Sequence, residues 1–492
     1  MNASAQPFFL QALEALKRGD RRSAAALLIR EIRDGNTAQK NLPSVAQLAA
    51  HIGEIDVAIE ASRRWSPGSI DGLRGYWAML GTYGRSDEAL QDIRRQPVSI
   101  REHPSVLHIR GTIVNQFGRV EEAQDLFRRA IAKMPYAMQT WFALAMIKKF
   151  SPGDPDLAAM ERLESIDAPA EVRASLSYAL GKARQDCGDA DRAFAHYSHG
   201  AELIRKQRPF DMKGHREAVE AMIGESGKQA MDELTPSRFE GQRSLFVTGL
   251  PRSGTTLTEQ LLVGHPAVVD GAELNLFAIA LTPVLGLARE KALRYQSSNG
   301  QDPWGAIARD YSHLLDMRFR STDLVVDKSL GQTLLTGLIL HSMPDARIAW
   351  LQRNPEDVAL SCFRNYFTAG LAWTCSLTNI ADYMRLEDRM LEQWKAVFPD
   401  RILIVPYEEL VRSPGEWSRR LQQHFGLPVE AGLETSLPMD RAVRTASVTQ
   451  VKQPISTSRI GQAAAFERHL GPFRDRYYGR TSRERATADG TD

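Results

Sequence analysis

A glycine that recurs about every 34 residues constrains the fold of the N-terminal part of the chain. In each copy an alanine follows the glycine five positions later. The six pairs are Gly19/Ala24, Gly53/Ala58, Gly84/Ala89, Gly118/Ala123, Gly153/Ala158 and Gly188/Ala193. Glycine permits the turn between two helices, and small residues let the helices approach closely, so a repeat of this length predicts stacked helical hairpins. An unrelated helical bundle would not need a fixed repeat length.

The repeats resemble those of the tetratricopeptide (TPR) family. The best copy, PSVLHIRGTIVNQFGRVEEAQDLFRRAIAKMP, has Gly111, Phe127, Ala130 and Pro135 at positions that such repeats prefer. We therefore expect about six TPR-type repeats over residues 1–205. The concave face of such an array commonly binds a peptide or a protein partner. A rigid spacer and a dimerisation surface, which would make a homodimer, are the alternatives.

Polar segments separate and end the predicted domains. A charged helical connector is predicted over residues 206–242, where Pro209, Pro236 and several glycines interrupt the apolar pattern. The polar residues 481–492 are predicted to form a disordered tail. Residues 243–480, which lie between these segments, are predicted to form a second domain.

Composition excludes several classes of protein. The net charge of +2 on 492 residues argues against a protein that coats a polyanion, so no nucleic-acid partner is expected. Cys187, Cys362 and Cys375 lie far apart and favour a reducing compartment over a disulfide framework or a zinc site. The N-terminus does not resemble a signal peptide, and no apolar run reaches the about 18 residues of a membrane helix. We therefore predict a cytoplasmic protein without a membrane span.

From residue 243 onward, short apolar runs alternate with helical patterns. The runs are SLFVTG, DLVVDK, RIAWLQR and RILIVPY, and each precedes a helical pattern. This alternation predicts an open, doubly wound parallel sheet, in which ligands bind at the carboxyl ends of the strands. The polar groups that follow the runs are residues 252–256, Lys328, Arg353 and Tyr407. Since three of the four groups contain a cation, we predict an anion site.

The segment LFVTGLPRSGTTL, residues 245–257, contains the most specific of these groups. Gly249 and Gly254 have the spacing of a phosphate-binding P-loop, but Thr255 stands where the P-loop lysine would be. Arg252 lies inside the loop instead. Backbone N–H groups at the start of the following helix suit a phosphate.

A nucleotide hydrolase or kinase would also need a magnesium site. Asp327 ends the run DLVVD, as an acidic residue does in such enzymes, but Lys328 follows directly and would compete with the metal ion. The P-loop kinase or NTPase therefore stays an alternative, with magnesium-dependent ATP binding as its expected property.

Three motifs together resemble sulfotransferases that use 3′-phosphoadenosine 5′-phosphosulfate (PAPS), nearest the protein-tyrosine sulfotransferase type. PRSGTTL resembles the loop that binds the 5′-phosphosulfate. WLQRNPEDVALSCF, with Arg353 and Ser361 eight residues apart, resembles the element that binds the 3′-phosphate. ILIVPYEELVRSP resembles the late strand, where Tyr407 would approach the nucleotide. The resemblance covers residues 243–478, and the expected fold class is α plus α/β, a TPR solenoid followed by a P-loop-like parallel-sheet sulfotransferase domain.

The resemblance implies roles for particular residues. In GHPAVVDGAELNLF, Glu273 would take the proton of the acceptor hydroxyl, with Asp270 and His265 as fallback bases. Arg252 and Lys328 would stabilise the transferring group and the leaving phosphate. No metal is expected, because these cations take the place of magnesium. The implied contacts of the co-substrate PAPS are Arg252, Ser253, Gly254, Thr255, Thr256, Arg353, Ser361, Tyr407, Ser447 and Lys452.

The chain departs from the family pattern at two places. Gln462 and Ala463 stand where a basic residue and a tryptophan commonly follow the loop that covers PAPS, and Arg459 is the expected replacement for the missing charge. Asn275 stands where the tyrosylprotein enzymes have an arginine near the acceptor. The acceptor is therefore left open between a peptide tyrosine and a carbohydrate or small-molecule hydroxyl. A TPR scaffold with an inactive sulfotransferase-like domain is the remaining alternative.

Overall fold

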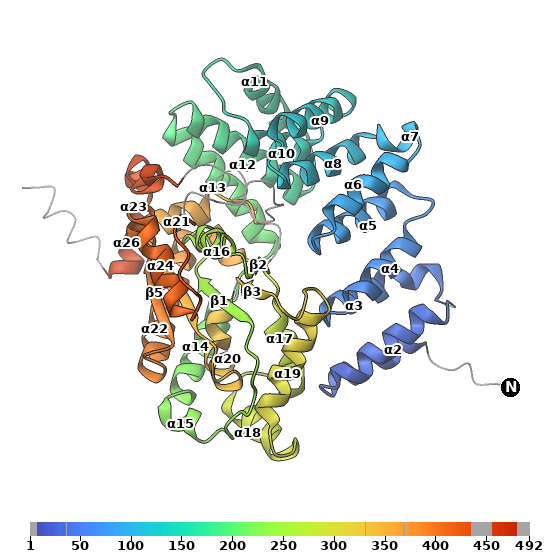
Figure 1. Cartoon of the computed structure of the whole chain (residues 1–492). Coiled ribbons are helices and arrows are strands. Elements are labelled where there is room, and N and C mark those ends of the chain that lie inside the picture. The colour runs from blue at the N-terminus through green and yellow to red at the C-terminus, as the bar shows by residue number, and fades with distance from the viewer. Residues whose placement is uncertain (1–6, 36, 330, 368–369, 434–454, 480–492) are drawn as a thin grey trace, which may run out of the picture.

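The computed structural model describes residues 7–35, 37–329, 331–367, 370–433 and 455–479. A mostly helical N-terminal region precedes a parallel sheet that is covered by helices (Figure 1), which confirms the predicted fold class at this level. The predicted PAPS contacts Ser447 and Lys452 and the predicted tail at 481–492 lie outside the described residues.

Successive helices of the N-terminal region are joined by the recurring glycines. In the described residues the helices are α1 Phe8–Lys17, α2 Arg21–Arg33, α3 Leu42–His51, α4 Ile55–Trp65, α5 Ile70–Thr82, α6 Ser86–Arg95, α7 Val98–Arg101, α8 Pro104–Gln116, α9 Val120–Lys133, α10 Met138–Ile147, α11 Pro155–Arg162, α12 Ala170–Asp186 and α13 Ala190–Gln207. Each recurring glycine has a positive φ between 74° and 85°, a conformation that residues with a Cβ rarely adopt. The predicted turns are confirmed.

The alanines of the repeat show where the pattern determines packing and where it does not. Five of the six are completely buried, but Ala158 is exposed. The helix α11 is short, and it buries Leu157 and Met160 instead. Close approach of two helices is clearest in the last hairpin, where a Cβ on Gly181 would lie 2.5 Å from the ring of Tyr197.

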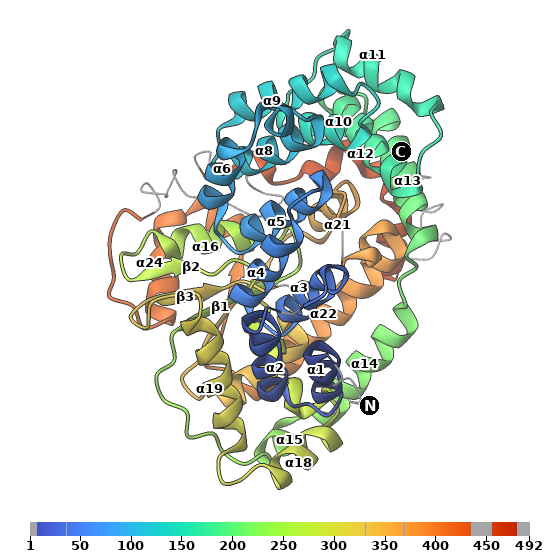
Figure 2. The ribbon, with the colours of Figure 1, turned by 90° about the vertical axis from the view of Figure 1, so that its right-hand side faces the viewer.

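The helical array curves around the C-terminal region and contacts it at both ends (Figures 1 and 2). At the N-terminal end, Arg22 of α2 forms an ion pair with Asp310 of α19, Pro303–Asp316. At the other end, Phe194 of α13 stacks on Phe363 with a centroid distance of 5.3 Å. The helices α5 and α8 therefore span the distance between two anchored ends, with the sheet on one side of them.

The parallel sheet has the strand order β2-β3-β1-β4-β5 among the described residues. The strands are β1 Ser244–Gly249, β2 Val268–Asp270, β3 Leu324–Asp327, β4 Ile348–Gln352 and β5 Ile402–Pro406. All four neighbouring pairs are parallel, and β1, β3, β4 and β5 coincide with the four predicted runs. The edge strand β2 was not predicted, because three residues are too few to show an apolar pattern.

Helices cover both faces of this sheet, as the doubly wound prediction requires. Phe246 of β1 packs into a core that contains Trp394, whereas its neighbour Val247 faces a core that contains Leu261 and Trp417. The described helices are α14 Met212–Glu225, α15 Lys228–Asp232, α16 Thr255–Val263, α17 Leu276–Ala280, α18 Arg289–Ser298, α19, α20 Thr336–Ser342, α21 Pro355–Phe363, α22 Leu377–Val397, α23 Tyr407–Arg412, α24 Pro414–His424 and α26 Gly471–Tyr478. Among them and the helices of the array, none combines the length and apolar character that a membrane span requires.

One carboxyl group is buried in the core beneath α22. Glu387 accepts a hydrogen bond of 3.0 Å from the Thr333 hydroxyl and is 5% exposed. Burial raises the pKa of Glu387 to about 8, although hydrogen bonds from Thr333 and Tyr383 oppose the shift. The folded protein therefore holds this proton at neutral pH, whereas the unfolded chain releases it near the ordinary value of 4.5.

We predict that Glu387→Gln removes a pH dependence of stability. The folded state binds the proton more tightly, so the free energy of unfolding falls as pH rises from about 4.5 to about 8. Glutamine imitates the protonated acid, so the variant should melt near the wild type at about pH 5 and several degrees higher above about pH 8. Thermal unfolding across this range tests it, with the exposed Glu217→Gln as control. An unchanged difference between variant and wild type at all pH values would contradict the prediction.

Candidate functional site

Three chemically distinct groups meet at the carboxyl edge of the sheet. The strand β1 pairs with β3 on one side and with β4 on the other, all in parallel. The loop 249–254, Lys328 and Arg353 follow these three strands directly. The structure therefore brings together residues that are up to 101 positions apart in the sequence.

Three residues of the loop after β1 have a positive φ, which residues with a Cβ rarely adopt. Gly249, Arg252 and Gly254 have φ values of 143°, 72° and 111°. A Cβ on Gly254 would lie 2.5 Å from the Tyr407 ring, and the Arg353 guanidinium lies 4.4 Å from the centre of that ring. The predicted contacts Ser253, Thr255 and Thr256 are all buried. The helix α16 begins at once, so its first N–H groups face the loop opening and suit an anion.

Partly buried arginines form a cluster beside this loop. The Arg252 Nε donates to the Ser361 hydroxyl at 3.0 Å, and the Arg353 Nη1 donates to the Arg252 carbonyl at 3.1 Å. Burial, together with the positive charges of Arg364, Arg459 and Arg353, lowers the pKa of Arg252 to about 10. The structure thus joins Arg252 to the predicted pair of Arg353 and Ser361. Holding these positive charges close together costs electrostatic free energy, which a bound anion would offset.

The sequence did not point to Arg364 as a member of this cluster. Its guanidinium donates to the Gln462 side-chain oxygen at 2.7 Å, and burial lowers the pKa of Arg364. The nearby carboxylate of Asp357 lies 3.6 Å from Arg353 but also accepts the backbone N–H groups of residues 461 and 463. Among the described residues, this one carboxylate is shared by Arg353 and two backbone donors. The Arg353 Nε is buried and has no hydrogen-bond partner among the described residues.

A half-buried arginine elsewhere in the fold shows what a structural role requires. The Arg401 guanidinium donates four hydrogen bonds of 2.6 to 2.9 Å to the carbonyls of Leu340, Met343 and Ala346. Carbonyls satisfy that cation without any ligand. In contrast, the one hydrogen bond that the structure gives to the Arg364 side chain within the described residues is the bond to Gln462. The contrast favours an anion-binding role for the cluster.

A lysine and two acids face one another beside the sheet edge. The Lys328 Nζ lies 3.4 Å from the Glu273 carboxylate and 4.0 Å from the Glu259 carboxylate. The side chains of Lys328 and Glu259 are 2% and 3% exposed, whereas that of Glu273 is 39% exposed. Glu273 is therefore the carboxylate of this group that a second molecule can reach.

The two fallback bases lie in different surroundings. His265 is 4% exposed, and its Nδ1 accepts the Ala267 N–H at 3.2 Å. Asp270 accepts the Ala272 N–H at 2.7 Å and shapes the turn that leads to Glu273. Of these three candidates, Glu273 alone lines the large cavity described next, within the part of the chain that the structure covers.

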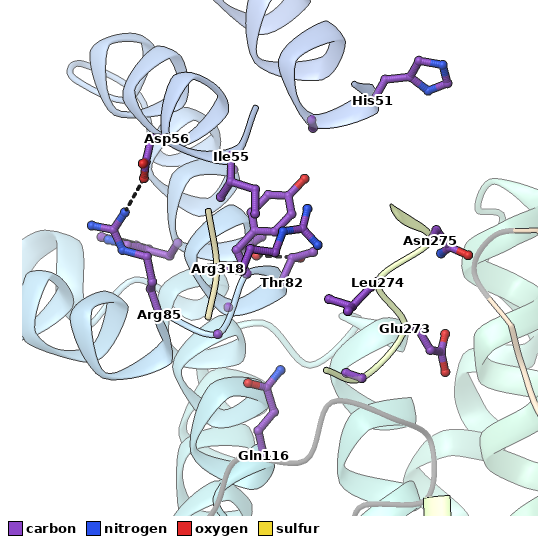
Figure 3. Close-up of a pocket in the computed structure, with 18 of the residues that line it drawn as sticks. His51, Ile55, Asp56, Thr82, Arg85, Gln116, Glu273, Leu274, Asn275 and Arg318 are labelled. Carbon is purple, nitrogen blue, oxygen red and sulfur yellow. Dashed lines mark hydrogen bonds and ion pairs between the residues drawn. The ribbon is translucent and has the colours of Figure 1, made fainter. Parts of the chain in front are cut away.

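A cavity of about 1370 Å³ lies between the helical array and the loop that carries Glu273 (Figure 3). Glu273 and Asn275 line one wall, and the opposite wall comes from the array. Charges of both signs face this space: the Arg85 guanidinium lies 3.6 Å from Asp56, and Arg74 lies nearby on α5. Sequence patterns gave no sign of this cavity, because they do not place the array against the sheet.

Comparisons with known proteins agree with part of the sequence interpretation. Residues 244–431 match the family model described as Sulfotransferase family, so the C-terminal region contains a domain of that family. An uncharacterized protein of Aquifex aeolicus is 28% identical over 400 residues, which are 78% of this chain and 52% of that protein. A protein-tyrosine sulfotransferase of Drosophila melanogaster is 23% identical over 189 residues, which are 37% of this chain and 38% of that protein. The chain thus spans about half the length of the first relative and less of the second.

The sulfotransferase domain from the Synechococcus PCC 7002 olefin synthase is a solved structure that matches part of this chain. It is 21% identical, and the match covers 47% of this chain and 91% of that domain with a TM-score of 0.34.

We predict opposite effects of Arg364→Met and Arg401→Met. Methionine at 364 removes a partly buried, poorly bonded charge, so the unliganded variant should melt at or above the wild type. The increase in melting temperature caused by pyrophosphate should fall by at least about half. Methionine at 401 cannot make the four hydrogen bonds of the arginine, so the melting temperature of that variant should fall by several degrees. Its stabilisation by pyrophosphate should equal that of the wild type. A destabilised Arg364→Met protein with the full response would refute the anion role.

Proposed function

We propose that this protein transfers the sulfuryl group from PAPS to an acceptor hydroxyl. The observation that carries the proposal is the meeting of a phosphate-type loop, a partly buried arginine cluster and the Lys328–Glu273 pair at one sheet edge. The match of residues 244–431 to the sulfotransferase family supports the same reaction.

The residues of the site fit the anionic groups of PAPS. We assign the 5′-phosphosulfate to the N–H groups of the loop 252–256 at the start of α16. We assign the 3′-phosphate to Arg353 and Ser361, with charge added by Arg364 and Arg459. The unbonded Nε of Arg353 supports this assignment, since a phosphate oxygen would satisfy it. The predicted contribution of Tyr407 is consistent with its ring against Gly254.

In the proposed reaction PAPS supplies the sulfuryl group, and the protein supplies position, a base and positive charge. Glu273 takes the proton from the acceptor hydroxyl, whose oxygen then bonds to sulfur. Lys328, together with Arg252, stabilises the negative charge that grows as the bond between sulfur and the phosphate oxygen breaks. Lys328 is 2% exposed, so water does not screen its charge.

The surroundings of Asp327 disfavour the kinase or NTPase alternative. Its Oδ1 accepts hydrogen bonds from the Ser329 hydroxyl at 2.6 Å and from the Gln332 amide at 2.7 Å. Its Oδ2 accepts the Tyr311 hydroxyl at 2.8 Å, and the residue is completely buried. A carboxylate with both oxygens engaged in this way is poorly placed to hold magnesium.

We infer that the acceptor binds in the cavity between the array and Glu273. Its volume of about 1370 Å³ exceeds the roughly 300–1,000 Å³ of small-molecule pockets. This size favours a peptide or carbohydrate chain that presents one hydroxyl to Glu273. The glycine turns support a TPR-type array over residues 1–205. We propose that this array binds the acceptor. A separate protein partner, a homodimer and a cytoplasmic location remain predictions from the sequence.

We predict that 3′,5′-diphosphoadenosine (PAP), the product nucleotide, raises the melting temperature by several degrees at saturation. Arg353→Met should reduce this increase strongly, because the variant loses a cation of the 3′-phosphate site. The exposed Arg389→Met, far from the cluster and paired with Glu220, serves as the control and should respond like the wild type.

Each other outcome of this experiment selects a different function. A response to ATP with magnesium and none to PAP would replace the proposal with a kinase or NTPase. A protein that responds to neither nucleotide would favour the scaffold with an inactive domain.

We predict that Glu273→Gln lowers kcat for sulfuryl transfer by at least about 100-fold, because the amide cannot take the acceptor proton. Affinity for PAP should not change, since Glu273 lies outside the arginine cluster. The measurement is transfer of labelled sulfate from PAPS to peptide and carbohydrate acceptors. Glu217→Gln, which alters an exposed acid outside the cavity, is the control and should retain the activity. Full activity of Glu273→Gln would remove Glu273 from the role of base.

A further inference from the structure

The loop that carries Glu273 is held in an unfavourable backbone conformation. Ala272 and Asn275, on either side of Glu273, have φ values of 55° and 52°. Residues with a Cβ avoid this left-handed region, although asparagine tolerates it better than alanine does. Such a conformation persists where surrounding contacts determine it, and it is common at functional sites.

Backbone hydrogen bonds fasten the first end of this loop to the strand β3. The N–H of residue 271 donates to the Val326 carbonyl at 3.0 Å, and the Lys328 N–H donates to the Ala272 carbonyl at 3.0 Å. The Ala272 N–H in turn donates to Asp270 at 2.7 Å and to Glu259 at 3.2 Å. These bonds continue the parallel pairing of β2 with β3, so several hydrogen bonds hold the first end of the loop in place.

Among the described residues, one side-chain hydrogen bond holds the backbone at the second end, where the helix α17 begins. The Asn275 N–H donates to the Ser329 hydroxyl oxygen at 2.7 Å. The same hydroxyl donates its hydrogen to the Asp327 Oδ1 at 2.6 Å. A serine hydroxyl has one hydrogen to donate, so the bond to Asp327 turns its lone pairs toward Asn275.

Asp327 is itself fixed from three directions. Besides Ser329, it accepts hydrogen bonds from the Gln332 amide and from the Tyr311 hydroxyl, which also contacts the Ser244 hydroxyl at 2.7 Å. Ser329 is 2% exposed and Asp327 is completely buried, so water does not compete for these bonds. The network is anchored in the core of the sheet and reaches the loop at one point.

We propose that Ser329 is a positioning residue that holds the Glu273 carboxylate against the Lys328 ammonium group. This inference rests on the proposed role of Glu273 as the base. Glu273 lies between a firmly bonded residue, Ala272, and Asn275, whose N–H is bound by the Ser329 hydroxyl alone among the described side chains. Without the hydroxyl, Asn275 relaxes toward an ordinary φ and Glu273 leaves its place 3.4 Å from Lys328. The proposed function assigns Ser329 no contact with PAPS or the acceptor, so its effect passes through the loop.

The test compares Ser329→Ala with Ser342→Ala in the full chain. Ser342 is also completely buried, but its hydroxyl has no hydrogen-bond partner among the described residues, so it controls for loss of a buried hydroxyl. Ser329→Ala should lower kcat by about 10- to 100-fold, with an unchanged KM for PAPS and an unchanged stabilisation by PAP. Ser329→Thr, which keeps the hydroxyl, should recover most of the activity. A loss that Thr does not recover, or one shared by Ser342→Ala, would overturn the proposal.

Hydrogen exchange of the peptide that covers residues 271–276 gives a readout that needs no turnover. Its amides should exchange at least about 10-fold faster in Ser329→Ala than in the wild type, while the peptide of the loop 249–256 exchanges at the same rate. If the wild type proves inactive with PAPS, the proposed function fails, but faster exchange would still establish that Ser329 holds the loop. Exchange at the wild-type rate would overturn the positioning role whatever the activity. If Ser329→Ala does not fold, Ser329→Cys replaces it, because a thiol fills the same place but is a weak hydrogen-bonding group.

Discussion

The parallel pairing of β1 with both β3 and β4 is the constraint on which the rest of the site depends. Each strand delivers a different group, namely the phosphate-type loop, Lys328 and Arg353. Because the strands are neighbours and run in one direction, their carboxyl ends meet at one edge of the sheet. The loop of Glu273 reaches the same edge through the pairing of β2 with β3. Reversal of any one strand would move its group to the far edge.

Under the proposed function, the arginine cluster favours a bound polyanion and destabilises the unliganded protein. Burial and mutual repulsion lower the pKa of Arg252, and burial lowers that of Arg364 and Arg459. Arg401 shows that the same fold can satisfy a half-buried guanidinium with four hydrogen bonds to carbonyls. Packing of α21 against the segment after residue 455 holds the cluster together despite the repulsion between its charges. A bound polyanion would relieve this repulsion and so stabilise the folded protein.

Conformational preferences of short segments made much of the fold predictable from the sequence. The features that were not predicted depend on contacts between segments that are distant in the sequence. Turns at the recurring glycines and the four longer strands follow from steric preferences over a few residues. The exposure of Ala158 and the short strand β2 depend on neighbours that a repeat pattern does not reveal. The spacing of Arg353 and Ser361 predicted that they lie together, whereas the contact of Arg364, at the end of α21, with Gln462 joins segments that are far apart in the sequence. A departure from the family pattern at 462 thus becomes a hydrogen-bond acceptor for a cation from another element.

The curvature of the array makes it part of the site under the proposed function. Contacts at Arg22 and Phe194 anchor its two ends to the C-terminal region, so α5 and α8 are held opposite Glu273. A catalytic domain alone would present Glu273 on an open surface, where water screens charges and competes for the base. The array encloses that surface in a cavity, and an acceptor must pass between the two walls to reach the carboxylate (Figure 3). The specificity of transfer therefore depends on side chains of the repeats as much as on those of the sheet edge.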